Sequence, residues 1–354
     1  PPRRSAARPA RAWSTLRRRR RRRYHAKMVV DKRQLVENGP AEVIEPCDIA
    51  LGRMIGTGRT AEVFLGLWNG KQVAIKQLYA QRMNESETIA FQREVSILVN
   101  VNHPNLVRLL GYCMSSAPKH LVCEYCEGGT LFEMLHNQRD LDLALVQQVK
   151  MCTDIAHGMD YLHKFTPQIV HRDLKSLNLL LAKPLTGLGD IPVVKVTDFG
   201  LARVVEPHDR KALTSFVGTI HWMAPEMFDS RSYDEKVDVY SYGIVVFEMF
   251  AREPPFEDRQ QEEIEQLVKK GARPTLEAVP QELPVELRDI MITSWAQNPR
   301  ERPSFGSIIQ ALSSVHCKVG LATRRPSPTS LVSASGYMSK TRAMGQVDMR
   351  AVSL

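Results

Sequence analysis

Long hydrophobic runs are absent from this sequence of 354 residues. Its most apolar stretch, residues 242–251, is interrupted by Glu248 and reaches half of the roughly 20 residues that a helix needs to span a bilayer. We therefore expect no segment that crosses a membrane. Glycine and proline, at 20 and 21 residues, are too few for a collagen-like repeat. The overall composition is that of a globular chain long enough to bury a sizeable core.

Cysteine is sparse, with six residues at positions 47, 113, 123, 126, 152 and 317. A chain of this size needs no disulfide staples, and no signal peptide is visible, so we expect a reducing compartment and a cytoplasmic location. Cys123 and Cys126 form one C-x-x-C pair, but no second pair follows at zinc-finger spacing. Because a structural zinc site requires four ligands, we do not expect zinc here.

Acidic residues are missing from residues 1–30, which contain eleven Arg and one Lys. Residues 318–354 contain six Lys or Arg against a single acid, Asp348. The formal net charge of +9 is therefore carried by the two ends, and the middle of the chain is net negative. The basic balance does not indicate a polyanionic partner for the core of the protein.

The first 27 residues are mostly Pro, Arg and Ala and include seven consecutive Arg at 17–23. Such a block repels itself and is expected to be disordered. It could be a nuclear or nucleic-acid-binding tag, which would imply a nuclear location, or an acid-poor organelle transit peptide. Alternatively it is upstream sequence translated in frame, because the first Met is Met28. We favour disorder or such translated upstream sequence, and do not expect nucleic-acid binding by residues 1–27.

Between the two ends, a region of strand-like patterns is followed by a region of helical patterns. Strand-like runs occupy residues 49–55, 62–68, 72–78, 107–113 and 120–125. One helix interrupts them, where Asn84 or Ser86 could cap a run with Ile89, Phe91, Val95 and Leu98 at helical spacings. Helical periodicity takes over after about residue 130, with a run at 145–159 and later runs near 234–250, 258–270, 284–297 and 304–316. This order predicts an α+β protein with a small β-rich lobe and a larger helical lobe, and a ligand site between them.

Two polar features lie in the strand-rich part. The string GTGRTAEV at 56–63 contains Gly56 and Gly58, which would let the backbone approach phosphates, although Ala61 replaces a third glycine. A strand rather than a helix follows, which argues against a dinucleotide-binding turn. Lys76 ends the apolar string VAIK, and burying its ammonium would require a carboxylate, for which Glu94 is the candidate.

The string HRDLKSLN at 171–178 is the strongest local signal. It places Asp173, Lys175 and Asn178 within six residues, between apolar runs, and burying so much polarity for packing alone would be unfavourable. Twenty residues later, DFG at 198–200 adds the carboxylate of Asp198. Asn178 and Asp198 together make an oxygen-ligand pair suited to Mg²⁺.

The ordered strings GTGRTAEV, VAIK, HRDLKSLN, DFG and APE resemble the signature set of protein kinases over residues 48–317. Three further strings, GTIHWMAPE, DVYSYGIVVFEM and NPRERPSF, resemble the tyrosine-kinase-like group, which includes Raf-type, mixed-lineage and plant Ser/Thr kinases. The resemblance implies the two-lobed kinase fold. It divides the chain into an N-lobe at 48–122, a hinge at 123–127 and a C-lobe at 128–317, with a linker at 31–47 and disordered segments at 1–30 and 318–354.

The resemblance also implies a role for each site residue. Gly56, Gly58 and the backbone at Ala61 would cover the phosphates of ATP, which Lys76 would hold while Glu94 orients it. The adenine would lie against Val63 and Ala74, with Cys123 as gatekeeper and hydrogen bonds to the backbone of Glu124 and Cys126. Asp173 would accept the proton of the substrate hydroxyl, and Lys175 would offset charge on the transferring group. Asn178 and Asp198 would hold Mg²⁺, with Mn²⁺ as an alternative.

Lys175 and Thr219 indicate substrate specificity, because tyrosine kinases usually carry other residues at both positions. The resemblance therefore implies transfer of the γ-phosphoryl group to Ser or Thr hydroxyls of protein substrates. A dual-specificity kinase is one alternative. A pseudokinase scaffold is another, which the presence of the complete catalytic set disfavours.

Residues 201–217 suggest regulation. Thr214 and Ser215 occupy positions where kinases carry activating phosphates, added by an upstream kinase or by the enzyme itself, and such a phosphate could pair with Arg172 or Arg203. Alternatively Arg172 simply pairs with nearby backbone or acids. Glu226 with Arg302, and Asp238, match structural positions of the family. The spacing between Asn178 and Asp198 exceeds the usual one by about seven residues, which we interpret as an insertion in a surface hairpin.

Overall fold

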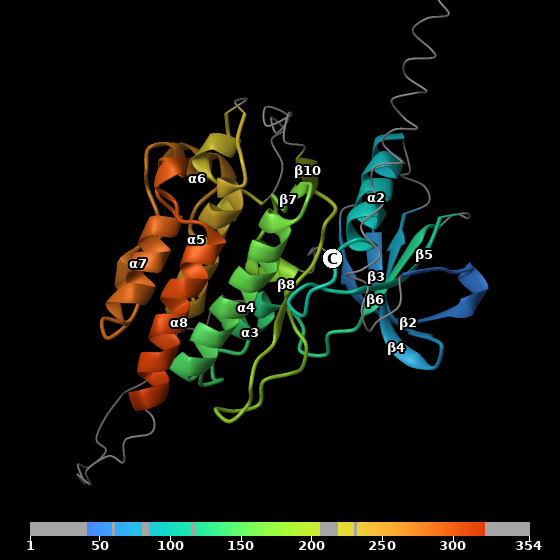
Figure 1. Cartoon of the computed structure of the whole chain (residues 1–354), viewed down its shortest axis with the longest axis horizontal. Coiled ribbons are helices and arrows are strands. Elements are labelled where there is room, and N and C mark those ends of the chain that lie inside the picture. Colours follow the sequence, from blue (N-terminus) through green and yellow to red (C-terminus); the bar gives the residue numbers. More distant parts are fainter. Residues whose placement is uncertain are drawn as a thin grey trace, which may run out of the picture. The chain divides into compact units, whose positions relative to one another are not determined.

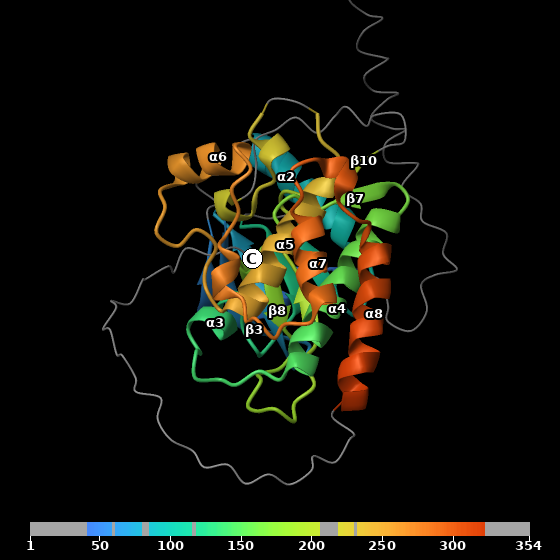
Figure 2. The same cartoon turned by 90° about the vertical axis from the view of Figure 1, so that its left-hand side faces the viewer.

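The computed structural model describes residues 41–58, 61–79, 85–114, 118–205, 219–229 and 232–322. The elements below all lie within the unit formed by residues 41–354 (Figures 1 and 2). The predictions for residues 1–40 and 323–354, and for Thr214 and Ser215, fall outside the described residues.

A six-stranded sheet in the order β1-β5-β6-β4-β3-β2 forms the N-terminal lobe (Figure 1). All neighbouring strands are antiparallel except β1 and β5, which are parallel. The strands are β1 (Glu42–Val43), β2 (Ile49–Thr57), β3 (Ala61–Trp68), β4 (Lys71–Leu78), β5 (Leu109–Cys113) and β6 (His120–Glu124). The predicted strands all form, and β6 extends two residues into the segment assigned to the hinge.

Alternation along β4 determines what faces the site. Val73 and Ile75 are fully buried on one face of the sheet, where they cluster with Ile44. Ala74 and Lys76 lie on the opposite face because successive strand residues point to opposite sides. Ile44 follows β1, so part of the segment assigned to the linker belongs to the packed sheet.

The single long helix of this lobe is α2 (Glu85–Leu98). Phe91, Val95 and Leu98 recur at helical spacing and are all buried in the main core. Glu94 lies on the same buried side of α2 and is 6% exposed. The helix therefore presents one carboxylate among apolar side chains.

Helices dominate the second lobe. They are α3 (Leu131–His136), α4 (Leu145–Lys164), α5 (Lys236–Ala251), α6 (Gln261–Lys269), α7 (Val285–Ser294) and α8 (Phe305–Ala322). Helix α5 is buried from Val237 to Phe250, which fits its apolar sequence, and it contacts α4 and α7 (Figure 2). Helix α8 continues five residues past the predicted domain end. Among the described residues, no helix is long and apolar enough to cross a membrane.

Two short ribbons and several single turns carry the catalytic segments. Strand β7 (Gln168–Val170) pairs with β10 (Arg203–Val205), and β8 (Leu179–Leu181) pairs with β9 (Val194–Val196). The 3-10 turns used below are η4 (Ser176–Asn178), η5 (Ile220–Trp222) and η6 (Pro225–Met227). The predicted insertion forms the loop between β8 and β9, where Gln147 Nε2 donates to the carbonyls of Gly187 and Asp190. The expectation of a two-lobed α+β kinase fold is confirmed.

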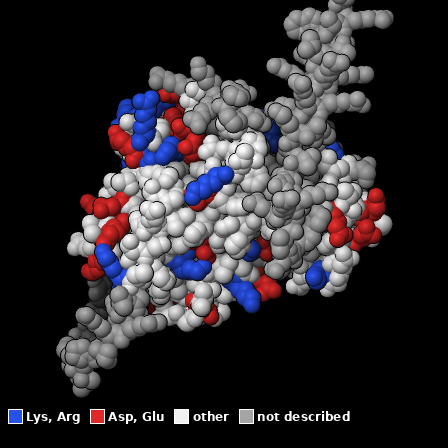
Figure 3. Space-filling model, viewed as in Figure 1, with Lys and Arg blue, Asp and Glu red and all other residues white. Residues whose placement is uncertain are grey.

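Charge is mixed over the described surface. In Figure 3, basic and acidic side chains lie interspersed, and no broad basic face is visible in this view among the described residues. Several are paired along α6, including Arg259 with Glu263 and Lys269 with Glu265. This distribution agrees with the expectation that the basic balance of the chain belongs to its ends.

Candidate active site

One pocket of about 440 Å³, its open mouth included, is lined by residues of both lobes. It brings together seven residues that the sequence singled out: Val63, Ala74, Lys76, Glu94, Cys123, Glu124 and Asp198. Six more apolar or small residues complete the lining: Leu98, Val107, Leu121, Leu180, Thr197 and Phe199. The pocket is thus mostly apolar, with charged groups at one end, as expected for a site that binds a flat base and an anionic tail.

The charged end is a cluster of three residues. Lys76 Nζ lies 2.7 Å from Glu94 Oε1 and 3.3 Å from Asp198 Oδ1, which joins β4, α2 and the segment after β9. Burial alone would lower the pKa of Lys76, but the two carboxylates raise it above its ordinary value. Burial favours a raised pKa for Asp198, and Lys76 and Lys175 reverse this and lower it. Lys76 therefore stays a cation, and Asp198 stays an anion.

The glycine-rich turn lies between β2 and β3. Gly58 N–H donates to Ala61 O at 2.7 Å, and the Tyr79 hydroxyl donates to Gly58 O at 3.4 Å. The same hydroxyl lies 3.0 Å from Thr57 Oγ1. Gly56, Gly58 and Ala61 do not line the pocket directly, and residues 59–60 lie outside the described part of the chain.

The predicted hinge begins within the last two residues of β6. Cys123 lies opposite Ala74 in the sheet and lines the pocket, whereas Cys126 packs against Val107 and Leu180 and does not line it. Burial raises the pKa of both thiols to about 12, so both remain protonated. Glu124 N–H donates to the carbonyl of Arg108, just before β5, at 3.0 Å, and the Glu124 carboxylate pairs with Lys195 at 2.9 Å. Of the C-x-x-C pair, Cys123 therefore contributes to the pocket wall, and Cys126 belongs to the apolar packing beside it.

A buried carboxylate from α5 holds the start of the HRD string. Asp238 is fully buried and accepts hydrogen bonds from the backbone N–H groups of His171 at 2.9 Å and Arg172 at 2.8 Å. His163 Nε2 lies 2.9 Å from the same carboxylate. Burial would raise the pKa of Asp238, but its hydrogen bond from His163 and the backbone donors lower it. Arg172 has a positive φ of 68°, so its backbone conformation depends on these contacts.

Asp173 receives donors on both carboxylate oxygens. Lys175 Nζ and Asn178 Nδ2 lie 2.8 Å and 3.1 Å from Oδ2. The backbone N–H and the hydroxyl of Thr219 each lie 3.1 Å from Oδ1, and Lys175 Nζ also donates to Thr219 Oγ1 at 2.7 Å. Four residues that the sequence places in two separate strings thus meet at one carboxylate.

The oxygen atoms of Asn178 and Asp198 fit a divalent cation. Asn178 Nδ2 donates to the carbonyl and the carboxylate of Asp173, which fixes the orientation of the amide. Asn178 Oδ1 is buried and has no hydrogen-bond partner among the described residues. No group of three or more His, Cys, Asp or Glu side chains in the described ranges could hold a metal ion. Such a pair of protein oxygens suits a metal that takes its remaining ligands from phosphates and water.

The sequence left open whether Arg172 pairs with a phosphate or with nearby backbone or acids, and in the structure it contacts backbone. Its Nε donates to Leu201 O at 2.7 Å, and its Nη1 lies 3.3 Å from the hydroxyl of Tyr233. The buried Nε of Arg203 has no hydrogen-bond partner among the described residues. Burial lowers the pKa of Arg172, and the nearby guanidinium of Arg203 lowers it further.

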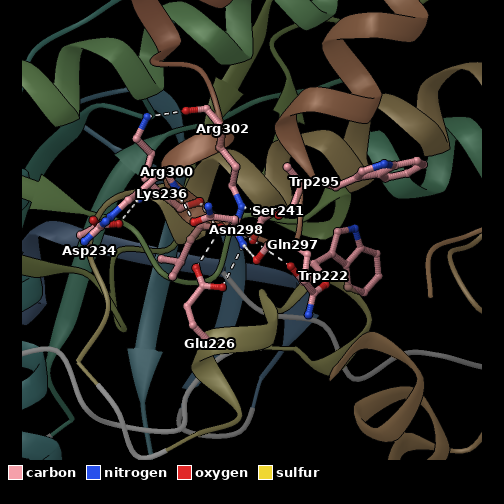
Figure 4. Close-up of polar contacts among 12 residues, drawn as sticks. Trp222, Glu226, Asp234, Lys236, Ser241, Trp295, Gln297, Asn298, Arg300 and Arg302 are labelled. Atoms are coloured by element: carbon pink, nitrogen blue, oxygen red, sulfur yellow. Dashed lines mark hydrogen bonds and ion pairs between the residues drawn. The ribbon is translucent and has the colours of Figure 1, made fainter. Parts of the chain in front are cut away.

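A buried ion pair anchors the segment that follows Thr219. Arg302 donates two hydrogen bonds to Glu226 at 2.6 Å and 2.9 Å, and one more to Lys236 O at 3.0 Å (Figure 4). Lys236 Nζ in turn donates to Arg302 O at 2.6 Å. The bidentate geometry ties η6 to the start of α5 and to the turn before α8.

Sequence reasoning missed part of the pocket lining and the support of the glycine-rich turn. Leu180 lies two residues beyond Asn178 in an apolar run, so its spacing could have indicated a position under the base. Val107 and Tyr79 reach the site through residues far away in the sequence: Val107 N–H donates to Val196 O at 2.8 Å, and the Tyr79 hydroxyl contacts Thr57.

Comparison with known proteins places this chain among one group of enzymes. The sequence model described as protein tyrosine and serine/threonine kinase matches residues 49–312. The RGS domain-containing serine/threonine-protein kinase A of Dictyostelium discoideum is 38% identical over 268 residues, which are 76% of this chain and 22% of that protein.

Two further relatives come from organisms other than Dictyostelium discoideum. The serine/threonine-protein kinase VIK of Arabidopsis thaliana is 35% identical over 278 residues, covering 77% of this chain and 61% of the relative. The mitogen-activated protein kinase kinase kinase 7 of Bos taurus is 36% identical over 275 residues, covering 77% and 44%. This chain spans less than two thirds of the length of each of these relatives.

Proposed function

This chain belongs to the protein tyrosine and serine/threonine kinase family, and from that premise we propose that it transfers the γ-phosphoryl group of ATP to serine and threonine hydroxyls of proteins. The observation that carries the proposal is the arrangement around Asp173. Lys175 and Thr219 both contact its carboxylate, and they also contact each other. A Ser or Thr hydroxyl at this point would meet a proton acceptor and a cation together.

Phosphoryl transfer passes through a charge-rich transition state, so the protein contributes mainly position and electrostatics. Kinases of this family use ATP and a divalent metal ion, and here Lys76 is the cation placed for the phosphates. The Lys76–Glu94 pair is formed, which is one of the contacts that active kinases require, and Lys76 also contacts Asp198, the residue that we assign to the metal.

Asp173 is the group we assign to proton transfer. Both of its oxygens already accept two hydrogen bonds, so a substrate hydroxyl would have to replace one donor. The Thr219 hydroxyl is the one best able to turn away, because it also accepts from Lys175. The Lys175 ammonium would then remain beside the transferring group and offset its charge.

We propose Mg²⁺ as the metal, with Mn²⁺ as a substitute, held by Asn178 and Asp198. The unpartnered Asn178 Oδ1 supports this assignment, because a buried amide oxygen without a donor is unfavourable unless a ligand completes it. A metal bound there would neutralise negative charge on the phosphates.

Transfer of labelled phosphate from Mg-ATP to casein tests the proposal. We expect Asp198→Ala to lower the rate by at least about 10²-fold, the lower end of the range for a positioned catalytic group. Asp190→Ala is the matched control: it removes the same carboxylate from the exposed loop after β8 and should leave the rate unchanged. Transfer that is equal in wild type and Asp198→Ala, or absent from wild type, would contradict the proposal and favour a pseudokinase scaffold.

Analysis of the phosphorylated amino acids separates the specificities. Phosphoserine and phosphothreonine alone would agree with the contact between Lys175 and Thr219. Phosphotyrosine in comparable amount would indicate a dual-specificity enzyme and overturn the Ser/Thr assignment.

We further propose that an upstream kinase or the enzyme itself phosphorylates Thr214 or Ser215. Arg203, whose Nε lacks a partner among the described residues, and the neighbouring Arg172 would supply the cations for such a phosphate. Phosphosite mapping after incubation with ATP should find one of the two residues modified. Activity that persists in the double variant Thr214→Ala/Ser215→Ala would exclude this mode of regulation.

A further inference from the structure

The most apolar helix of the protein contains a buried carboxylate that the mechanism above does not use. Glu248 of α5 is fully buried, and its neighbours along the helix are almost all apolar. Burying an ionised carboxylate is strongly unfavourable unless hydrogen bonds or a cation compensate. Among the ion pairs of the described residues, its partner is His136 and not a Lys or Arg. An apolar residue would fill this position at lower energetic cost, so the carboxylate calls for an explanation.

Three donors from three separate elements converge on Glu248. Ser176 Oγ in η4 donates to Oε1 at 2.7 Å, and Trp222 Nε1 in η5 donates to Oε2 at 2.7 Å. His136 Nε2 of α3 lies 3.1 Å from Oε1 and must donate, because a carboxylate can only accept. The two oxygens of the Glu248 carboxylate thus accept hydrogen bonds from two different loops.

These two loops are the ones that build the active site. Ser176 directly follows Lys175 and lies two residues before Asn178. Trp222 lies three residues after Thr219. The loops meet directly at Asp173 through Lys175 and Thr219, and a second time through Glu248. Two separate points of attachment fix the orientation of one loop relative to the other, which a single contact cannot do.

The Glu248 carboxylate is not needed to attach the backbone of Trp222 to α5, because another residue of the helix already does so. Ser241, which lies seven residues before Glu248 on α5, donates to the backbone carbonyl of Trp222 at 2.8 Å. That bond fixes the Trp222 backbone to α5 without involving the catalytic loop. What Glu248 adds is the link from the Trp222 side chain to Ser176.

We propose that Glu248 is a positioning residue that couples the substrate-facing loop to the catalytic loop. Through Trp222 it holds Thr219 in place, and through Ser176 it holds Lys175 and Asn178. The backbones of the two loops then keep their positions around Asp173 while substrate binds, even where the Thr219 hydroxyl turns away. The inference rests on the proposed phosphoryl transfer, because its main readout is kinetic.

The variants Ser176→Ala and Trp222→Phe each remove one donor and leave Glu248 in place. Trp222→Phe should raise the KM for casein about tenfold, the effect of losing one hydrogen bond to a charged group. Ser176→Ala should lower kcat about tenfold for the same reason. The KM for ATP should stay within about twofold in both, because neither residue lines the nucleotide pocket. A uniform loss of all three parameters would indicate a general structural defect and overturn the proposal.

The double variant tests the coupling itself. If both side chains act through Glu248, the combined loss in kcat/KM falls short of the product of the single losses by about threefold or more. Ser241→Ala is the matched control, since it removes a buried serine hydroxyl that contacts Trp222 but not Glu248. Its effect should multiply with that of Ser176→Ala. Simple multiplication in the Ser176→Ala/Trp222→Phe pair would overturn the proposal.

A readout without catalysis separates this inference from the proposed function. In protein labelled with ¹⁵N at tryptophan, the Trp222 indole signal should shift in Ser176→Ala, although Glu248 is the only hydrogen-bonding link between the two side chains in the described structure. An unchanged indole signal overturns the coupling. A wild-type protein that transfers no phosphate but shows the shift would contradict the proposed function and leave the positioning intact.

Discussion

The two sides of the active site are held in different ways. On the catalytic side, His171, Arg172 and Asp173 are at most 8% exposed, and Asp238 binds the backbone of the first two. On the nucleotide side, the glycine-rich turn is half-buried, and the Tyr79 hydroxyl contacts it at Thr57 and Gly58. The catalytic side is fixed by buried charge, and the nucleotide side by one phenol at its edge.

This difference matches what each side has to do. The catalytic groups must already be oriented when charge develops, because reorientation during the reaction would raise the barrier. Under the proposed function, the nucleotide side would admit ATP and release ADP in every cycle, so a weaker attachment would be an advantage there. Lys76 is the exception on the nucleotide side, since Glu94 and Asp198 hold it as firmly as Asp238 holds the catalytic loop.

The largest expected effect comes from removing the anchor of the catalytic side. Asp238→Ala leaves two buried backbone N–H groups and His163 without their acceptor. We expect the free energy of unfolding to fall by about 3–5 kcal/mol, as for the loss of one partner of a buried polar pair. Urea denaturation followed by circular dichroism measures this change.

Asp160→Ala is the control for that measurement. It removes the same side chain from a surface pair with Lys164 on α4, and exposed pairs contribute less than about 1 kcal/mol. Equal losses in the two variants would mean that Asp238 is not a special anchor, and the contrast between the two sides would disappear.

A second prediction uses the charge of Asp238. Its pKa in the folded protein is lowered from the ordinary value of 3.8, so its contribution to stability is complete above that value and is lost as the pH falls through the lowered one. The stability difference between wild type and Asp238→Asn should therefore not decrease between about pH 7 and pH 5. Urea denaturation of both proteins at several pH values measures it. A difference that shrinks within that window would show that the carboxyl is not stabilised as an anion.

Much of the fold could be predicted, because most of its longer elements have a recognisable hydrophobic pattern in the local sequence. Strand β4 was expected at 72–78 and spans Lys71–Leu78, since the alternation VAIK carries a period of two. Several short elements could not be predicted, among them one helix and one strand. Helix α3 is six residues long, too short for a periodic signal, and β1 is a two-residue strand that exists only because β5 pairs with it.

In the candidate site too, groups close in sequence could be predicted, and contacts between distant residues could not. Asp173, Lys175 and Asn178 are close in sequence, so their association could be inferred before the structure was known. The contacts of Asp173 with Thr219 and of Ser176 with Glu248 join residues 46 and 72 positions apart. No local pattern specifies such pairs, because they depend on how α5 packs beneath both loops. In the sequence, Glu248 is distinguished only as the residue that interrupts an apolar run.

The smallest expected effect lies on the nucleotide side. Tyr79→Phe keeps the ring but removes the hydroxyl that contacts Thr57 and Gly58. Because one neutral hydrogen bond is worth about 1 kcal/mol or less, we expect the KM for ATP to rise about threefold. The kcat and the free energy of unfolding should not change measurably, since the turn does not contact Asp173. Steady-state kinetics at varied ATP and saturating casein measure this.

Tyr161→Phe provides the matched control, because it removes a phenol that accepts a bond from Asn102 N–H, away from the pocket lining. Thr57→Val should reproduce the effect of Tyr79→Phe, and the double variant should be no worse than either single one. That result would place both hydroxyls in one contact that sets how readily the turn closes over ATP. If Tyr79→Phe instead lowered kcat as strongly as a change near Asp173, the glycine-rich turn would belong to the rigid side of the site. The distinction between a preorganised catalytic half and a yielding nucleotide half would then have to be abandoned.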